Sequence, residues 1–289
     1  MPDRRPMIAR TLPSWQRSLA TAVSDPFRLL ELLDLPVGLL GDRVRAEEAR
    51  AHFPLRVPLA FVRRMRPGDP DDPLLRQVLP LDRETEPAPG FVTDPLAESV
   101  ALPVPGLLHK YRGRALMVVT GACGVHCRYC FRRHFPYGEA SPGRSAWDGA
   151  LSYLAEDPAI EEVILSGGDP LAVSDGLLAE LAARLEAIPH LKRLRVHTRM
   201  PVVLPERVDE ALLGWLDACR LRPVLVIHTN HPREIDDDVV AAMARLSGAG
   251  VLLLNQAVLL RGVNDREDTL RELSERCFEA GVLPYYLHL

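Results

Sequence analysis

The chain has 289 residues, of which 47% are hydrophobic and 26% are charged, and this composition is typical of a globular protein with a sizeable core. Its 35 basic and 39 acidic residues leave a formal net charge of −4, so there is no basic excess for non-specific binding of nucleic acid. The 26 prolines are scattered rather than repetitive, which excludes collagen-like and low-complexity chains.

The termini and the cysteine content indicate the compartment. The N-terminal residues are charged but no apolar stretch follows them, so we expect no signal peptide. The longest uncharged apolar run, 251–260, has about half the length that a bilayer requires, so we expect no membrane partner. Of the five cysteines, three lie close together, which predicts a metal or redox site in a reducing compartment. We therefore expect a cytoplasmic protein.

Residues 1–105 predict an N-terminal extension that is mainly helical or extended. Apolar residues at helical spacing predict two helices, Ser14–Val23 and Asp25–Leu33, with Ser14 and Asp25 as their N-caps. A proline-rich stretch with interspersed apolar residues follows. We expect it to wrap over a second domain rather than to form a free linker.

Residues 106–289 follow a regular pattern, in which short strand-like runs alternate with longer amphipathic segments. This alternation predicts an α/β domain with a parallel sheet and right-handed crossovers. The sixth strand reaches the end of the chain. The predicted strands are Ala115–Thr120, Ile160–Ser166, Lys192–Thr198, Pro223–Thr229, Val251–Val258 and Val282–Leu289, and the predicted helices between them are Ser145–Glu156, Ser174–Ile188, Pro205–Cys219, Asp236–Leu246 and Arg266–Ala280.

Polar residues follow five of these strands. In parallel α/β folds, active sites form at the carboxyl ends of the strands and in the loops after them. We therefore expect these residues to meet at one edge of the sheet. In chain order they are Cys123, Cys127 and Cys130, then SGGDP (166–170), HTR (197–199), HTNHP (228–232) and Asn255–Gln256.

The cysteine loop is the sharpest chemical signal. Cys123, Cys127 and Cys130 have the spacing CxxxCxxC, and clustered thiolates select iron–sulfur clusters, zinc or Cu(I). Three ligands to a four-iron cluster would leave one iron open to a substrate or cofactor. Structural zinc would need a fourth ligand, which His126 or His134 could supply. The other two cysteines lie alone on predicted helices and predict no site.

The cysteine loop resembles that of the radical S-adenosylmethionine (SAM) superfamily, in which three cysteines hold a [4Fe–4S] cluster and the open iron binds SAM. The wider motifs resemble the lysine 2,3-aminomutase family over essentially the whole chain. These motifs are GACGVHCRYCFRRHFPY (121–137), HKYRGRAL (109–116), ILSGGDPL (164–171), TRMPVVLP (198–205), HTNHP (228–232) and NQAVLLRGVND (255–265). The strings HFPY and PSWQ (13–16) are most similar to one branch, whose members make β-lysine for modification of elongation factor P (EF-P).

The resemblance implies a partial (β/α)6 barrel of the radical SAM type, similar to a TIM barrel. It implies three cofactors: a [4Fe–4S] cluster on the three cysteines, SAM, and pyridoxal 5′-phosphate (PLP). It further implies that Arg132 binds the substrate carboxylate, and that Lys110 and Arg114 bind the PLP phosphate. The residues implied for SAM are Gly167, Gly168, Asp169, His228 and Gln256.

The implied reaction begins with an electron that is delivered to the cluster and cleaves SAM. The resulting radical takes a hydrogen from the β-carbon of lysine held on PLP, and the nitrogen migrates from Cα to Cβ. The implied partners are L-lysine, an electron donor such as flavodoxin or ferredoxin, and a functional link to EF-P. A homo-oligomer is compatible with the sequence. Alternatives are a catabolic lysine or glutamate 2,3-aminomutase, and a non-catalytic iron–sulfur or zinc scaffold that binds EF-P.

The lysine content bears on the PLP site. The chain contains only Lys110 and Lys192, whereas the resemblance places the Schiff-base lysine well after the sixth strand. We therefore expect a C-terminally truncated aminomutase that holds the cluster and SAM but does not form the internal Schiff base. The acidic residues that select the substrate side chain are also expected beyond residue 289.

Overall fold

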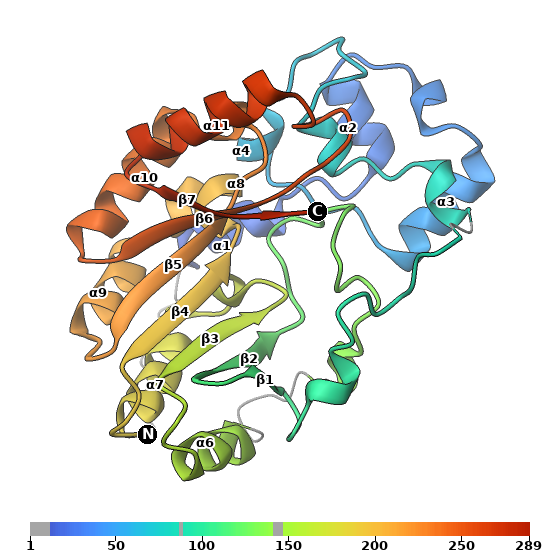
Figure 1. Cartoon of the computed structure of the whole chain (residues 1–289). Helices are drawn as coiled ribbons and strands as arrows, with labels where there is room; N and C mark the ends of the chain where they lie inside the picture. Colours follow the sequence, from blue (N-terminus) through green and yellow to red (C-terminus); the bar gives the residue numbers. More distant parts are fainter. Residues whose placement is uncertain (1–11, 87–88, 141–146) are drawn as a thin grey trace, which may run out of the picture.

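A curved seven-stranded sheet forms the centre of the computed structural model, which describes residues 12–86, 89–140 and 147–289. Strands β2 to β7 are parallel in sequence order, which confirms the predicted α/β core (Figure 1). The strands are β1 (Leu107–Tyr111), β2 (Arg114–Thr120), β3 (Glu162–Gly167), β4 (Arg193–Thr198), β5 (Arg222–His228), β6 (Leu252–Val258) and β7 (Leu283–His288).

Strand β1 is an element that the sequence analysis missed. It pairs antiparallel with β2 through a tight hairpin, in which Tyr111 is the partner of Arg114. Gly113 in this turn has a φ of +85°, a conformation that glycine adopts without steric cost. The short strand therefore extends the parallel sheet by one antiparallel edge.

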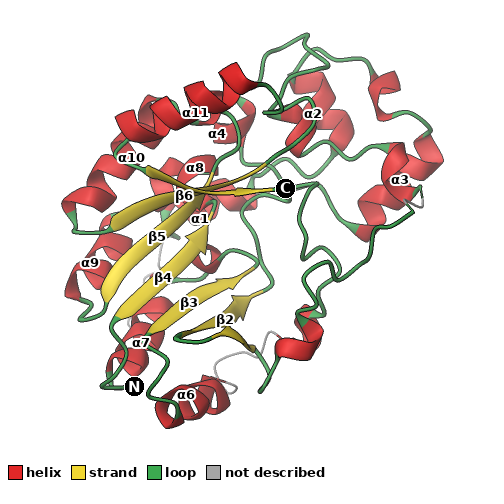
Figure 2. Ribbon diagram, viewed as in Figure 1, coloured by secondary structure: helices red, strands yellow, loops and turns green. Residues whose placement is uncertain are grey.

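Five helices connect the consecutive parallel strands and lie along one side of the sheet (Figures 1 and 2). In the fourth of them, Val239, Met243 and Leu246 recur at helical spacing and are buried. None of the helices in the described ranges is long and apolar enough to cross a membrane. The predicted start of the first helix, Ser145, lies outside the described residues. The five helices are α6 (Trp147–Glu156), α7 (Asp175–Glu186), α9 (Glu210–Ala218), α10 (Asp237–Gly248) and α11 (Glu267–Glu279).

The N-terminal segment is helical and extended, as expected. Its apolar side chains, among them Trp15, Leu29 and Phe61, join the same buried cluster as the side chains under the crossover helices. The N-terminal segment and the sheet with its crossover helices therefore share one core. The helices of this segment are α1 (Ser14–Ala20), α2 (Pro26–Leu32), α3 (Arg43–His52) and α4 (Leu59–Val62), and two further short helices are α5 (Tyr137–Ala140) and α8 (Met200–Val203).

The two predicted N-caps of this segment have different outcomes. The carboxylate of Asp25 accepts a hydrogen bond from the backbone N–H of Phe27, which confirms it as the N-cap of α2. Ser14 is not an N-cap, because α1 begins at Ser14 itself and Pro13 holds the cap position. The fixed φ of Pro13 sets the extended entry into this helix instead of a side-chain hydrogen bond.

The two faces of the sheet differ in composition. We call the face under the crossover helices the outer face. Met117, Leu165, Val196 and Leu225 are successive partners across β2 to β5 and are all buried on it. Side chains alternate along a strand, so their neighbours project to the opposite, inner face. The inner face carries Arg114, Glu162, Arg195, His197, His228 and Gln256, together with a small apolar group of Val224, Val226 and Leu254.

Candidate functional site

The loop after β2 carries Cys123, Cys127 and Cys130, and all three side chains are half-buried. Burial raises the pKa of Cys123 above its usual range, and the charges of Asp169 and of the other two cysteines add to this effect. Burial, followed by the charge of Cys127, also raises the pKa of Cys130 to about 11. At neutral pH these two thiols are therefore protonated, and a bound metal centre would displace their protons.

The glycine motif at the end of β3 is hydrogen-bonded to the backbone at the start of the cysteine loop. The backbone N–H of Gly168 donates to the carbonyl of Thr120 at 2.7 Å, and that of Asp169 donates to the carbonyl of Ala122 at 2.8 Å. A Cβ atom on Gly167 or on Gly168 would lie 2.5 Å or less from these same two carbonyl oxygens. Both positions therefore require glycine because two backbones meet there, a reason that the sequence alone did not provide.

The carboxylate of Asp169 ties the same loop to the end of β4. It is buried and accepts hydrogen bonds from the Thr198 hydroxyl and from the backbone N–H groups of Leu171, Arg199 and Met200, at 2.7 to 3.1 Å. Burial nevertheless raises the pKa of Asp169. The structure therefore gives this predicted SAM residue a positioning role that holds three strand-end loops together.

His228 and Gln256 lie side by side at the same edge. They are partners in the register of β5 and β6, and both are half-buried on the inner face. Burial lowers the pKa of His228 to about 3, and the positive charge of Arg199 adds to this effect. At neutral pH the imidazole is uncharged, so one ring nitrogen donates and the other accepts a hydrogen bond. Its Nε2 lies 3.4 Å from the hydroxyl of Tyr129 in the cysteine loop.

Arg132 also reaches this edge, but its guanidinium is already paired. Its Nε and Nη2 donate to the two carboxylate oxygens of Glu98 at 2.8 and 2.7 Å, and its Nη1 donates to the Ser166 hydroxyl at 2.8 Å. All three side chains are buried. The bidentate pair with Glu98 occupies the edge between Nε and Nη2, and the Ser166 hydroxyl engages Nη1. Sequence reasoning missed Glu98, because no local pattern links residues that lie 34 positions apart.

The structure does not bring Lys110 and Arg114 to the cysteine loop. Both lie at the β1–β2 hairpin, and Arg114 is separated from Thr120 by the length of β2, about 20 Å. The ammonium of Lys110 donates to the carbonyl of Leu96. Arg114 lines a polar hollow of about 450 Å³ that also includes Glu162 and Arg193. The predicted phosphate residues thus lie at the amino ends of the strands, where Glu161 and Glu162 line the same hollow as Arg114.

The zinc alternative finds no support in the geometry. In the described ranges no three His, Cys, Asp or Glu side chains converge closely enough to hold one metal ion. The Nδ1 of His126 lies 2.8 Å from the carbonyl oxygen of Pro54, and His134 is exposed. A four-iron cluster spreads its cysteine ligands over separate irons, so three sulfurs on one loop need not converge on a single point.

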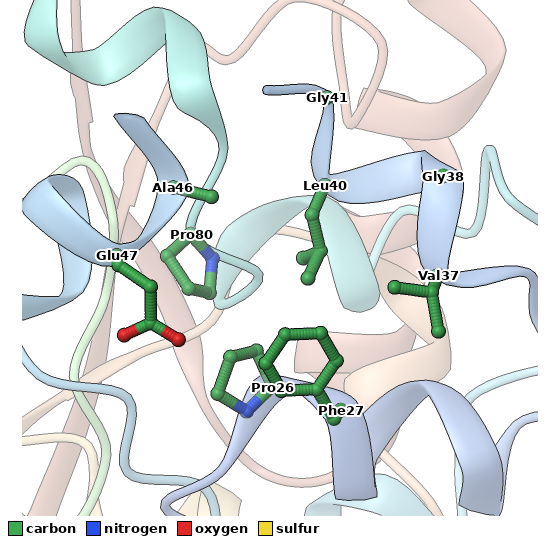
Figure 3. A pocket seen from close by; sticks show the side chains of 9 residues that line it. All are labelled: Pro26, Phe27, Val37, Gly38, Leu40, Gly41, Ala46, Glu47 and Pro80. Carbon is green, nitrogen blue, oxygen red and sulfur yellow. The ribbon is translucent and has the colours of Figure 1, made fainter. Parts of the chain in front are cut away.

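A second cavity lies away from this edge. It has a volume of about 110 Å³ and is lined by residues of the N-terminal segment, among them Phe27, Leu40 and Pro80 (Figure 3). Glu47 contributes the one carboxylate drawn at its rim. With this lining the cavity has no evident part in the chemistry of the strand ends.

Residues 117–273 match the family model of the radical SAM superfamily, which confirms the superfamily predicted from the cysteine loop. The chain is 52% identical to the L-lysine 2,3-aminomutase of Escherichia coli strain K12 over 277 residues, which is 95% of this chain and 80% of that protein. It is 49% identical to the protein of the same name from Haemophilus influenzae, over 98% of this chain and 82% of that one. A Clostridium subterminale protein, also named L-lysine 2,3-aminomutase, is 41% identical over 77% of this chain and 53% of its own length.

Proposed function

Because the chain belongs to the lysine 2,3-aminomutase family of the radical SAM superfamily, we propose that it converts L-α-lysine to β-lysine. One observation carries the proposal: the cysteine loop, the His228–Gln256 pair and Arg132 lie at a single edge of the inner face. That edge offers soft ligands for a cluster, neutral polar groups for a cofactor and a cation for a carboxylate.

The residues fit the cofactors of this family. Cys123, Cys127 and Cys130 would hold the [4Fe–4S] cluster, and His228 and Gln256 would contact SAM. When bound, the cluster, SAM and PLP supply the radical and electrophilic chemistry, and the protein supplies binding and orientation. Burial on the inner face strengthens the electrostatic interactions through which the chain orients its ligands.

Arg132 would orient the substrate by its carboxylate. Glu98 and Ser166 fix the guanidinium through Nε, Nη1 and Nη2, so a substrate carboxylate would share these donors or displace Glu98 from them. The cations Arg114 and Arg195 lie on the same face, and together with Arg132 they lower the pKa of His197 to about 3, an effect in which burial is the largest cause. Arg132 and Arg195 are paired with Glu98 and Glu162, so a substrate carboxylate or a phosphate would compete with these partners for the guanidinium groups.

The PLP phosphate would bind Lys110 and Arg114 at the β1–β2 hairpin, where Arg114 but not Lys110 lines the polar hollow. Neither lysine of the chain is placed for a Schiff base near the cysteine loop. Lys192 pairs with Glu161 at 2.5 Å just before β4, and Lys110 lies on β1. After borohydride reduction in the presence of PLP, we expect peptide mapping to find no stoichiometric adduct on either lysine. Such an adduct on Lys110 would make it the Schiff-base residue instead.

We propose further that the protein is cytoplasmic, receives electrons from flavodoxin or ferredoxin, and supplies β-lysine for modification of EF-P. The HFPY string (134–137) and PSWQ (13–16) support the last point, since they resemble the branch with that role. Clustered, unpaired cysteines support a reducing compartment.

The central test measures product under anaerobic, reducing conditions. Reconstituted protein with SAM should form 5′-deoxyadenosine, and protein that also carries a Schiff-base lysine for PLP should convert L-lysine to β-lysine and give no β-glutamate from L-glutamate. Formation of β-glutamate would favour the glutamate 2,3-aminomutase alternative. A preparation that binds iron and sulfide but never cleaves SAM would favour the scaffold alternative.

A further inference from the structure

A buried polar network lies directly behind the cysteine loop, and its centre is Arg199. The side chain of Arg199 is only 5% exposed. Its Nη1 donates to the sulfur of Cys127 at 2.7 Å, and its Nη2 donates to Gln77 Oε1 and Glu234 Oε2 at 2.7 and 2.8 Å. One buried cation therefore joins the end of β4 and the N-terminal segment to a predicted ligand of the cluster.

The surroundings of Arg199 fix its direction. Its backbone N–H donates to Asp169 at 2.7 Å, and its guanidinium carbon lies 5.3 and 5.6 Å from the ring centres of Phe61 and Tyr129. Glu234, which is fully buried, also accepts from the side-chain amide of Gln77 at 3.0 Å. With these contacts on several sides, the guanidinium is held against Cys127.

A cation at this place acts on the electron affinity of the cluster. Uptake of one electron takes a [4Fe–4S] cluster from the 2+ to the 1+ state, and no proton or other atom is transferred. Glu234 pairs with the guanidinium and offsets part of its charge. The added negative charge on the cluster is therefore stabilised mainly by the hydrogen bond that Nη1 donates to the ligand sulfur, and more strongly in a buried setting. The contact should therefore make the cluster easier to reduce.

We propose that Arg199 is a positioning residue that raises the reduction potential of the cluster through its contact with Cys127, and that Gln77 and Glu234 hold it there. The inference rests on the proposed function, because it requires a cluster on the three cysteines. It adds a role for the HTR motif after β4, a motif that the proposed reaction does not otherwise use.

The test is a redox titration of the anaerobically reconstituted protein with dithionite as reductant, followed by the electron paramagnetic resonance signal of the reduced cluster. In Arg199→Gln the midpoint potential should move to a more negative value. Arg199→Lys keeps the charge but cannot reach Cys127, Gln77 and Glu234 together, so its shift should have the same sign and be smaller. Iron and sulfide content is measured in every sample.

Arg207→Gln is the matched control. Arg207 is also fully buried, but it bonds the carbonyl of Leu171 and the carboxylate of Asp175, and its guanidinium lies on the ring of Trp15. This variant should lose thermal stability and keep the wild-type potential. An equal shift in the control would attribute the effect to general loosening and overturn the proposal.

The remaining outcomes also decide. Wild-type potentials in both Arg199 variants would overturn the proposal. It would also be overturned if neither Arg199 variant took up iron while the control did, because Arg199 would then serve cluster assembly. If Arg199→Lys takes up the cluster and Arg199→Gln does not, the potential of Arg199→Lys decides alone. A more negative value supports the proposal, and an unchanged or more positive value overturns it. Wild-type protein without iron and sulfide would instead refute the proposed function itself, and the inference with it.

Discussion

The outer and inner faces of the sheet are made from the same strands but have opposite chemistry. On the outer face, the row from Met117 to Leu225 is apolar, buried and covered by the crossover helices. On the inner face, Glu162 and Arg195 are buried as an ion pair with 2.6 Å between Oε1 and Nε, and the neutral His197 lies within reach of the charge of Arg195. The strands thus separate two functions by the alternation of their side chains.

This difference distinguishes what stabilises the fold from what does chemistry. Apolar burial on the outer face is favourable without any ligand, whereas a buried ion pair such as Glu162–Arg195 gains little net stability. Parallel sheets usually have apolar residues on both faces. The polar inner face therefore departs from the pattern that stability alone would select, which is the mark of a ligand-binding surface.

The cysteines provide the largest contrast. Replacement of Cys123, Cys127 or Cys130 by alanine should each abolish the brown colour and the iron and sulfide content of anaerobically purified protein. Cys277→Ala and Cys219→Ala should retain both, because Cys277 is buried in the apolar core and Cys219 ends α9. Metal and sulfide analysis decides. Stoichiometric zinc without sulfide in the wild-type protein would contradict the cluster.

Substitution of one leucine on each face compares how much the two faces contribute to stability. Leu225→Ala on the outer face should lower the free energy of unfolding by about 3 kcal/mol, because it leaves a cavity in the main core. Leu254→Ala on the inner face removes a member of a cluster of only three residues and should cost less. Denaturant melts of apo protein measure both values. Equal losses would show that the inner face carries as much of the core as the outer one.

Arg132 tests the inner face as a binding surface. Arg132→Lys keeps the charge but loses the planar pair of donors, so the affinity for L-lysine should fall about a hundredfold, as expected when one or two charge-assisted hydrogen bonds are lost. Titration calorimetry on protein loaded with cluster, SAM and PLP measures this change. Lysine amide, which has no carboxylate, should bind wild type and variant alike. An unchanged affinity for L-lysine would place the carboxylate elsewhere, and Arg133 would be the next candidate.

Glu98 refines that test, because it can either hold Arg132 in place or compete with the substrate for it. If it holds the guanidinium, Glu98→Gln should weaken L-lysine binding about tenfold through a looser bidentate pair. The variant Glu31→Gln, which breaks an exposed pair with Arg28, serves as the control and should bind normally. A higher affinity for L-lysine in Glu98→Gln would show that Glu98 occupies the place of the substrate carboxylate.

The sequence predicted the outer face better than the inner one. All six parallel strands were identified, since runs such as Val163–Leu165 follow from apolar composition and local turns. Strand β1 was missed because it is only five residues long. Helix α3 was missed because it is mostly polar, with few apolar positions to reveal its period.

The inner face depends on pairings between distant segments. Sequence motifs identified Arg132 and Arg199, but not Glu98 and Gln77, which reach them from the N-terminal segment. The glycine motif was recognised, yet its physical reason, contact with the backbone of the cysteine loop, required coordinates. Partners separated by 34 and 122 positions have no local signature, so only the fold identifies them.

His197 gives the smallest expected effect and tests the polarity of the inner face by itself. Burial and then the charges of Arg195 and Arg132 lower its pKa from 6.5 to about 3, so below pH 6.5 the unfolded chain binds a proton that the folded chain does not. This stabilisation is fully present above pH 6.5 and is lost as the pH falls toward 3. The loss between pH 6 and pH 5 should be about 1 kcal/mol. Denaturant melts of His197→Gln should therefore show a shallower fall in the free energy of unfolding over that interval than wild type. Parallel curves for the two proteins would mean that His197 is as free to accept a proton in the folded state as in the unfolded one, and the inner face would then be less cationic than its arginines indicate.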